Sequence, residues 1–197
     1  MEAERQPVRT PRGAARRLDL LRRVTDDLAE RGLADFSLRR AARAAGTTHK
    51  VLLYHFGSGE KLLAEAVTEL RRRRTARGEA TAPAASLAER VRALWPVLVG
   101  AEGAALHQAM GLAMYDPQRH AALARDASAG YLVALVGVCP PEWPERRKRE
   151  VAAMILATLR GFLLDRYTSG SDELVDLGFA ALERALRAEE AKTVDGE

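Results

Sequence analysis

Apolar residues recur at intervals of three and four along most of the chain, which is the spacing of one face of an α-helix. The first such segment extends from about Ala14 to Arg31 and is followed by Gly32, a residue that commonly ends helices. We expect this helix to bury one apolar face, made of Leu18, Leu21, Val24 and Leu28. Alanine, leucine and arginine are abundant and aromatic residues make up only 5% of the chain, which favours helices over strands.

The segment Ser37–Phe56 has the pattern of two short helices joined by a tight break. Ser37 is a good N-cap for the first helix, Gly46 ends it, and Thr47 or Thr48 can begin a second helix that extends to about Tyr54. Apolar residues lie on one side of the second helix, whereas the other side is cationic and able to form hydrogen bonds. Such a helix, held by a glycine turn against a supporting helix, is typical of a helix-turn-helix that enters the major groove of DNA.

The remaining pattern predicts helices throughout. Ser58 can cap a helix that ends near Arg77, with four consecutive arginines, Arg71–Arg74, which we interpret as a solvated face near its C-terminus. Residues 78–85 are rich in alanine, with one glycine and one proline, and are interpreted as a hinge. Further helices are expected over residues 86–100, 104–115, 118–138, 144–167 and from 171 to about 188. The predicted fold class is all-α, divided into an N-terminal arm and helix-turn-helix domain (1–57), a connecting helix (58–77) and a helical body (78–197).

Charge is distributed unevenly. Residues 1–77 contain 18 Lys and Arg against 10 Asp and Glu, whereas residues 78–197 contain 13 against 17. A basic DNA-binding head with an acidic body would account for this difference. Arginines of the N-terminal stretch (Arg5, Arg9, Arg12, Arg16 and Arg17) could follow DNA phosphates or belong to a solvated tail. The single Cys139 is consistent with a reducing cytoplasm, and no signal peptide or membrane span is recognised.

Three stretches of the head resemble the N-terminal domain of the TetR family of transcriptional regulators. They are Gly32-Leu-Ala-Asp-Phe-Ser-Leu, Ala44-Ala-Gly-Thr-Thr and Leu52-Leu-Tyr-His-Phe-Gly-Ser followed by Leu62-Leu, and the resemblance covers roughly residues 12–68. The family pattern usually has a phosphate-binding tyrosine at the position of Leu53 and a lysine at that of Gly59. Tyr54, His55 and Lys61 are the nearby residues that could take over these contacts.

Candidate DNA-binding residues follow from the two short helices. His49 and Lys50 would point at base edges or flanking phosphates, and Thr48 can contact a thymine methyl group. The resemblance implies that His55 contacts a phosphate. The full candidate set is Ser37, Arg39, Arg40, Thr47, Thr48, His49, Lys50, Tyr54, His55 and Lys61.

The resemblance also implies a homodimer in which the last two helices of each subunit form a four-helix bundle. Their apolar stripes support this expectation, although the stripes could instead fill the core of one subunit. The candidate interface residues are Ile155, Leu159, Leu163, Leu174, Leu177, Ala181 and Leu182. A small-molecule effector would bind in the body, where the large or polar candidates are Trp95, His107, Met110, Met114, Tyr131, Met154 and Phe162. Arg160 could meet an anionic ligand or pair with an acid in the interface.

An enzyme is disfavoured. The four histidines do not have metal-ligand spacings, and phosphate-loop, dinucleotide-binding and nucleophile-elbow motifs are missing from the sequence, so we expect no cofactor or metal. The favoured function is a cytoplasmic, dimeric repressor that binds a palindromic DNA operator and is released by a small molecule. Two alternatives remain open: a regulator controlled by a protein partner or by its own concentration, and a basic helical module without sequence preference.

Overall fold

The computed structural model describes residues 10–79, 86–124 and 128–192, and these residues form ten α-helices and no β-strand. The prediction of an all-α protein is therefore confirmed. The helices are α1 (Pro11–Arg31), α2 (Leu38–Ala44), α3 (His49–Phe56), α4 (Gly59–Glu79), α5 (Leu87–Leu98), α6 (Ala101–Tyr115), α7 (Pro117–Ala124), α8 (Ala129–Val138), α9 (Glu145–Ser169) and α10 (Asp172–Glu190). Not one of them is long and apolar enough to cross a membrane.

Hydroxyl side chains fix where many of the helices begin. Ser37 and Thr48 accept a hydrogen bond from the first turns of α2 and α3, and Ser58 accepts one from the amide of Lys61 in α4. Ser86 and Glu89 form a reciprocal capping box at α5. Each cap satisfies an amide that has no partner within its own helix. Because such capping residues can be recognised in the sequence, these boundaries agree with the predicted ones to within a few residues.

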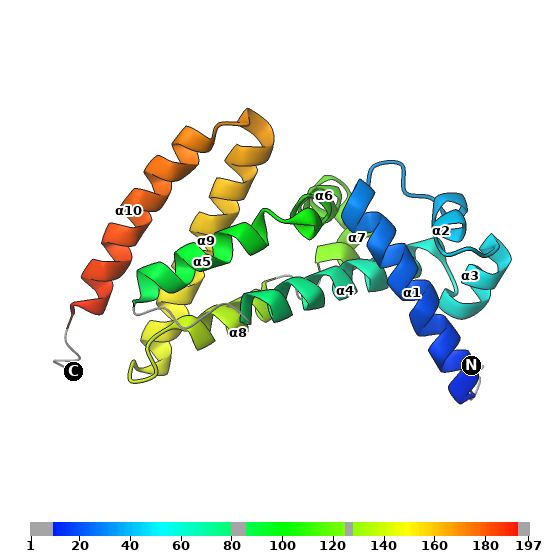
Figure 1. Ribbon diagram of the computed structural model, residues 1–197, viewed down its shortest axis with the longest axis horizontal. Helices are drawn as coiled ribbons and strands as arrows, with labels where there is room; N and C mark the ends of the chain where they lie inside the picture. The colour runs from blue at the N-terminus through cyan, green and yellow to red at the C-terminus, as the bar shows by residue number, and fades with distance from the viewer. Residues whose placement is uncertain (1–9, 80–85, 125–127, 193–197) are drawn as a thin grey trace.

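The molecule is elongated, with α1–α3 at one end and the antiparallel pair α9 and α10 at the other (Figure 1). Two separate clusters of buried side chains hold it together. One joins α1–α4 with α6 and α7, and the other joins α5, α8, α9 and α10. Helix α4 extends from the first cluster toward the second. The division at residues 57 and 77 stays a prediction, but α6 and α7 share their core with α1–α4, which include the predicted head.

Several expectations are corrected. The first helix begins at Pro11 after an N-cap by Thr10, and its buried face includes Leu20, whereas Leu18 is 63% exposed. The segment 118–138 forms two helices, α7 and α8. Arg5, Arg9 and most of the expected hinge lie outside the described residues.

Candidate DNA-binding surface and ligand cavity

A glycine turn holds α3 against α2. Gly46 has φ +62°, a left-handed conformation that a residue with a side chain rarely adopts, and its amide donates to the carbonyl of Arg43. The amide of Thr47 donates to the carbonyl of Ala42, which completes the reversal at the end of α2. Leu52 and Phe56 anchor α3 in the core of the head. The helix is short, so this packing, rather than its own propensity, fixes its orientation.

The opposite side of α3 is open to solvent (Figure 1). His49 and Lys50 in its first turn are exposed, and the Tyr54 side chain is 81% exposed. Thr48 is also exposed but uses its hydroxyl to cap the helix. Thr47 is half-buried. The structure thus brings four of the candidate residues, Thr48, His49, Lys50 and Tyr54, onto one exposed surface.

Arg40 differs from its neighbour Arg39. The Arg39 side chain is exposed, whereas the Arg40 guanidinium is bound within the head. Its Nε donates to Asp27 at 2.7 Å, and its two Nη atoms donate to the carbonyls of Ala34, Gly32 and Asp27. Arg40, a candidate DNA-binding residue, therefore holds the start of α2 against the end of α1.

A second arginine ties three helices of the head together. Arg17 of α1 donates from Nε to the carbonyl of His55 at 3.1 Å, pairs with Glu65 of α4 at 2.5 Å and lies over the Phe56 ring. Its side chain is only 16% exposed, so its role is structural. Of the arm arginines within the described residues, Arg12 and Arg16 remain exposed on α1.

The positions that depart from the family pattern have physical explanations or substitutes. A Cβ at Gly59 would lie 3.2 Å from Cγ of Leu38, so glycine allows the first turn of α4 to approach α2 closely. The Leu53 side chain is 36% exposed at the edge of the α3 surface. Lys61 is exposed and His55 is half-buried beside this surface.

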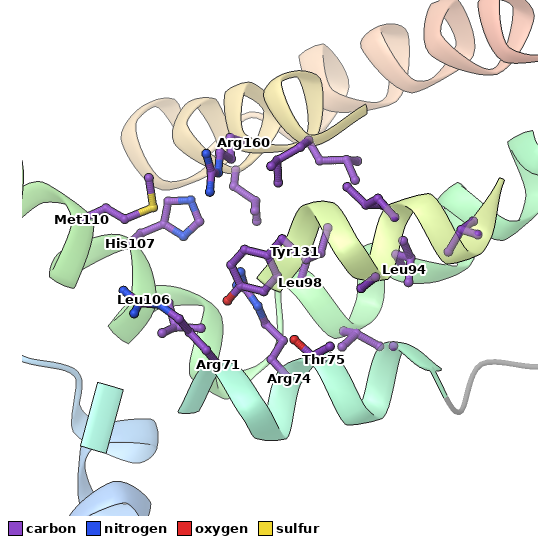
Figure 2. A pocket seen from close by; sticks show the side chains of 18 residues that line it. Arg71, Arg74, Thr75, Leu94, Leu98, Leu106, His107, Met110, Tyr131 and Arg160 are labelled. Carbon is purple, nitrogen blue, oxygen red and sulfur yellow. The ribbon is translucent and has the colours of Figure 1, made fainter. Parts of the chain in front are cut away.

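The body contains a cavity of about 100 Å³ enclosed by α4, α5, α6, α8 and α9 (Figure 2). Its walls are mainly aliphatic. Polar side chains enter from three sides: Arg71, Arg74 and Thr75 from α4, His107 from α6, and Arg160 from α9, with Tyr131 of α8 between them. The described lining residues include no carboxylate side chain.

Arg74 is the most unusual of these residues. It is 6% exposed, and its Nε and Nη1 have no hydrogen-bond partner among the described residues. Its guanidinium lies 4.7 Å from the centre of the Tyr131 ring, and the Tyr131 hydroxyl is likewise buried without a partner in the described part of the chain. A buried charge with incomplete hydrogen bonding lowers stability, so this arrangement needs an explanation other than folding.

Arg160 and His107 respond to the same environment. Burial lowers the pKa of Arg160, and the charge of Arg74 acts in the same direction, while the guanidinium donates to the Ser128 hydroxyl at 3.2 Å. Burial also lowers the pKa of His107, helped by the nearby charges of Arg74 and Arg160 and opposed by its contact with the carbonyl of Gly103. His107 Nδ1 donates to that carbonyl at 3.0 Å, so Nε2 of the neutral ring is an acceptor.

Three of the seven candidate ligand residues, His107, Met110 and Tyr131, line the cavity. Trp95 and Phe162 do not; Trp95 packs edge to face on Phe162 and on Phe179, and the Phe162 and Phe179 rings are tilted against each other in the body core. Met114 and Met154 are 81% and 41% exposed and lie outside the cavity. Arg71 and Arg74 were missed as lining residues because the run Arg71–Arg74 was interpreted as solvated. The signal was present, since Arg74 follows Val67 and Leu70 on the buried face of α4.

The candidate interface residues divide into two groups. Ile155, Leu159, Leu163 and Leu182 are at most 6% exposed and are buried within the chain itself. Leu174 and Leu177 are 57% and 63% exposed, and Ala181 is exposed beside them. On α9 a second exposed apolar row contains Met154, Ala157, Gly161 and Leu164.

Helix α6 connects the cavity to the head directly. His107 lines the cavity, and the adjacent Gln108 accepts a hydrogen bond from the amide of Leu33 at 2.6 Å through its Oε1. Leu33 lies in the turn between α1 and α2. Helix α4 provides a second connection, because Leu62, Ala66 and Leu70 belong to the core of the head and Arg74 to the cavity.

Comparison with known proteins confirms the resemblance inferred from the head. Residues 27–66 match the family model for bacterial regulatory proteins of the tetR family. No curated protein sequence matches the chain. A TetR-family transcriptional regulator from Cytophaga hutchinsonii shares the fold, with a TM-score of 0.67 and 16% identity over 91% of this chain and 96% of that one. The TetR transcriptional regulator from Legionella pneumophila has a TM-score of 0.66 and 14% identity, over 92% of this chain and 100% of that one. The multidrug binding protein EbrR, complexed with proflavin, has a TM-score of 0.64 and 22% identity, over 86% of this chain and 98% of that one.

Proposed function

We propose, from a head and a fold that match those of TetR-family transcriptional regulators, that this protein is a dimeric repressor. It would bind a palindromic DNA site through α3 and leave that site when a small molecule occupies the cavity. The observation that carries the proposal is the exposed polar and cationic surface of α3, held rigidly by the core of the head.

DNA binding would use side chains on and beside the exposed surface of α3. Lys50 and His49 would read base edges, and Arg39 and Lys61, with Tyr54 and His55, would contact the phosphates on either side. Arg40 and Arg17 would act indirectly, by fixing α2 and α3 relative to α1 and α4. A single head reads few base pairs, so an affinity that discriminates among genomic sites requires two heads.

Dimerisation would use the exposed apolar rows of α9 and α10. Both helices have two apolar faces, one buried in the subunit and one exposed, and a helix with apolar residues on both sides normally buries both. These two helices lie at the end of the molecule opposite the head in Figure 1. A four-helix bundle of two such pairs would set the distance between the two copies of α3.

Replacing Leu174 and Leu177 together with glutamate should convert the dimer to a monomer, since four carboxylates would enter the apolar interface. Sedimentation velocity measures the change. Leu18→Glu is a matched control, because Leu18 is also 63% exposed but lies on α1. A double variant that still sediments as a dimer would place the interface elsewhere.

Release by an effector would follow from the two connections between cavity and head. A ligand that favours another arrangement of α4 and α6 would change the orientation of the heads, and its differential affinity for the two arrangements sets the size of the effect. EbrR, which shares the fold, is a multidrug binding protein in complex with proflavin. That neighbour supports the proposal that the body of this chain also holds a small molecule.

Selection of bound sequences from a random DNA pool tests the proposal. An enriched palindrome with half-sites one or more helical turns apart is the expected result. A single asymmetric motif would contradict the dimeric arrangement. Binding without enrichment, which simply weakens with salt, would favour the basic helical module over a sequence-specific regulator. If a palindrome is enriched but no small molecule releases it, control by a protein partner or by concentration is favoured.

A further inference from the structure

We infer that the cavity of the body takes an organic anion: a small, mainly apolar molecule with a carboxylate-like group that binds between Arg74 and Tyr131. The inference rests on the proposed function only in assuming that the cavity holds a ligand. It adds the chemical class of that ligand, which the fold does not specify.

The first argument is the set of groups without partners. Nε and Nη1 of Arg74 are hydrogen-bond donors, and the Tyr131 hydroxyl can donate as well. All three are buried, and the two side chains are in contact through the Tyr131 ring. Nε and Nη1 point to different sides of the guanidinium, so one carboxylate can accept from one of these two nitrogens, and this charge-assisted hydrogen bond would compensate the buried positive charge.

The second argument is charge. Arg160 enters from α9 on the side of the cavity opposite Arg74, as Figure 2 shows, and His107 lies between α6 and these two arginines. The described lining residues provide no carboxylate to balance this charge. Burial is the main cause of the lowered pKa values of His107 and Arg160, and the positive charge of Arg74 acts in the same direction on both. A cationic ligand would add to that charge, whereas an anion would compensate it.

The third argument is the rest of the wall. Leu94, Val97, Leu98, Leu106, Met110 and Leu156 are among the apolar side chains that surround the remaining space. They offer no hydrogen bonds, so the part of the ligand that they contact must be apolar. The cavity therefore fits an amphipathic organic acid better than an inorganic anion, whose full hydration would be lost against these walls.

A matched set of probes tests the charge requirement: 4-phenylbutyrate, the neutral 4-phenylbutyramide and the cationic 4-phenylbutylamine. Their binding to the DNA-free protein is measured by isothermal titration calorimetry at one fixed salt concentration. We expect the acid to bind at least about tenfold more tightly than the amide, because a hydrogen-bonded ion pair replaces a neutral contact, and we expect the amine not to bind. Equal binding of acid and amide, preferred binding of the amine, or no binding of the acid would each overturn the inference.

Two variants locate the site. Arg74→Met keeps the length of the side chain and should weaken binding of the acid about ten- to hundredfold. Arg72→Met is the control: Arg72 lies on the same helix, carries the same charge and pairs with Glu69, but its side chain is 68% exposed. Tyr131→Phe removes only the hydroxyl and should cause a smaller loss. Unchanged affinity in Arg74→Met, verified as folded by circular dichroism, would contradict the assignment.

DNA release is measured separately, by fluorescence anisotropy with the selected DNA site. If the acid binds at Arg74 but leaves DNA binding unchanged, the anion site stands and the proposed release mechanism fails. If the amide or the amine binds at least as tightly as the acid and releases DNA, the release mechanism stands and the anion site fails.

Discussion

Arg40 in the head and Arg74 in the body are both largely buried arginines, but their surroundings differ. All three guanidinium nitrogens of Arg40 donate to described groups, namely Asp27 and three carbonyls. Two nitrogens of Arg74 have no partner in the described part of the chain. A fully bonded buried charge holds a structure together, whereas an incompletely bonded one is retained at a cost to stability. Arg40 thus stabilises the head, whereas Arg74 leaves hydrogen-bond donors in the cavity that a ligand could use.

The largest effect is expected for Arg40→Met. The substitution removes the 2.7 Å ion pair of the largely buried Asp27 carboxylate, which keeps only Arg31 at 3.7 Å, and one donor to each of three carbonyls, which should lower the free energy of unfolding by about 3 kcal/mol. Urea unfolding followed by circular dichroism measures it. A loss below about 1 kcal/mol would show that Arg40 behaves as an ordinary surface residue.

Arg74→Met should have the opposite sign. Removing an incompletely bonded buried charge, while keeping the apolar stem, should raise the free energy of unfolding of the ligand-free protein by about 1 kcal/mol, after allowing for the lost contact with the Tyr131 ring. The same urea experiment applies. A destabilisation comparable to that of Arg40→Met would mean that Arg74 is a structural residue and would erase the difference between the two sites.

The smallest stability effect concerns pH. His107 has a pKa below its ordinary value of 6.5 in the folded protein, so the unfolded chain binds its proton more readily. Its contribution to stability is fully present above about pH 6.5 and is lost as the pH falls through the folded-state pKa. His107→Gln should reduce this pH dependence, whereas Met110→Leu, on the same helix and cavity wall, should retain it. An identical pH dependence in wild type and His107→Gln would show that the cavity does not disfavour the protonated ring.

The same contrast between head and body separates what the sequence could predict from what it could not. In the head, caps such as Ser37 and Thr48 and the stop at Gly46 are local signals, and the structure confirms those boundaries. The exposed side of α3 followed from periodicity alone. Arg40 could not be distinguished from Arg39 in this way, because its partners come from α1 and the turn after it.

In the body the decisive information is tertiary. Helix α10 has two apolar faces, one with Leu174, Leu177 and Ala181 and one with Val175, Phe179 and Leu186, and periodicity does not tell which is buried in the subunit. The cavity is formed by five helices spread over residues 59–169, and periodicity does not show which of their side chains meet. Of the seven candidate residues, only His107, Met110 and Tyr131 line the cavity. The run Arg71–Arg74 passes around α4, with Arg74 inside and Arg72 outside; the spacing of Arg74 from Val67 and Leu70 indicated its buried position, but the interpretation of the whole run as solvated overrode that signal.

The most direct measurement is the salt dependence of affinity for the selected DNA site, compared between wild type and Lys50→Ala by fluorescence anisotropy. Lys50 lies on the exposed surface of α3, and two copies would contact one palindrome. The account predicts weaker binding by the variant and a logarithmic salt slope smaller by about two for the dimer, since each lysine releases about one counterion. Equal affinity and an equal slope would contradict the placement of α3 on DNA.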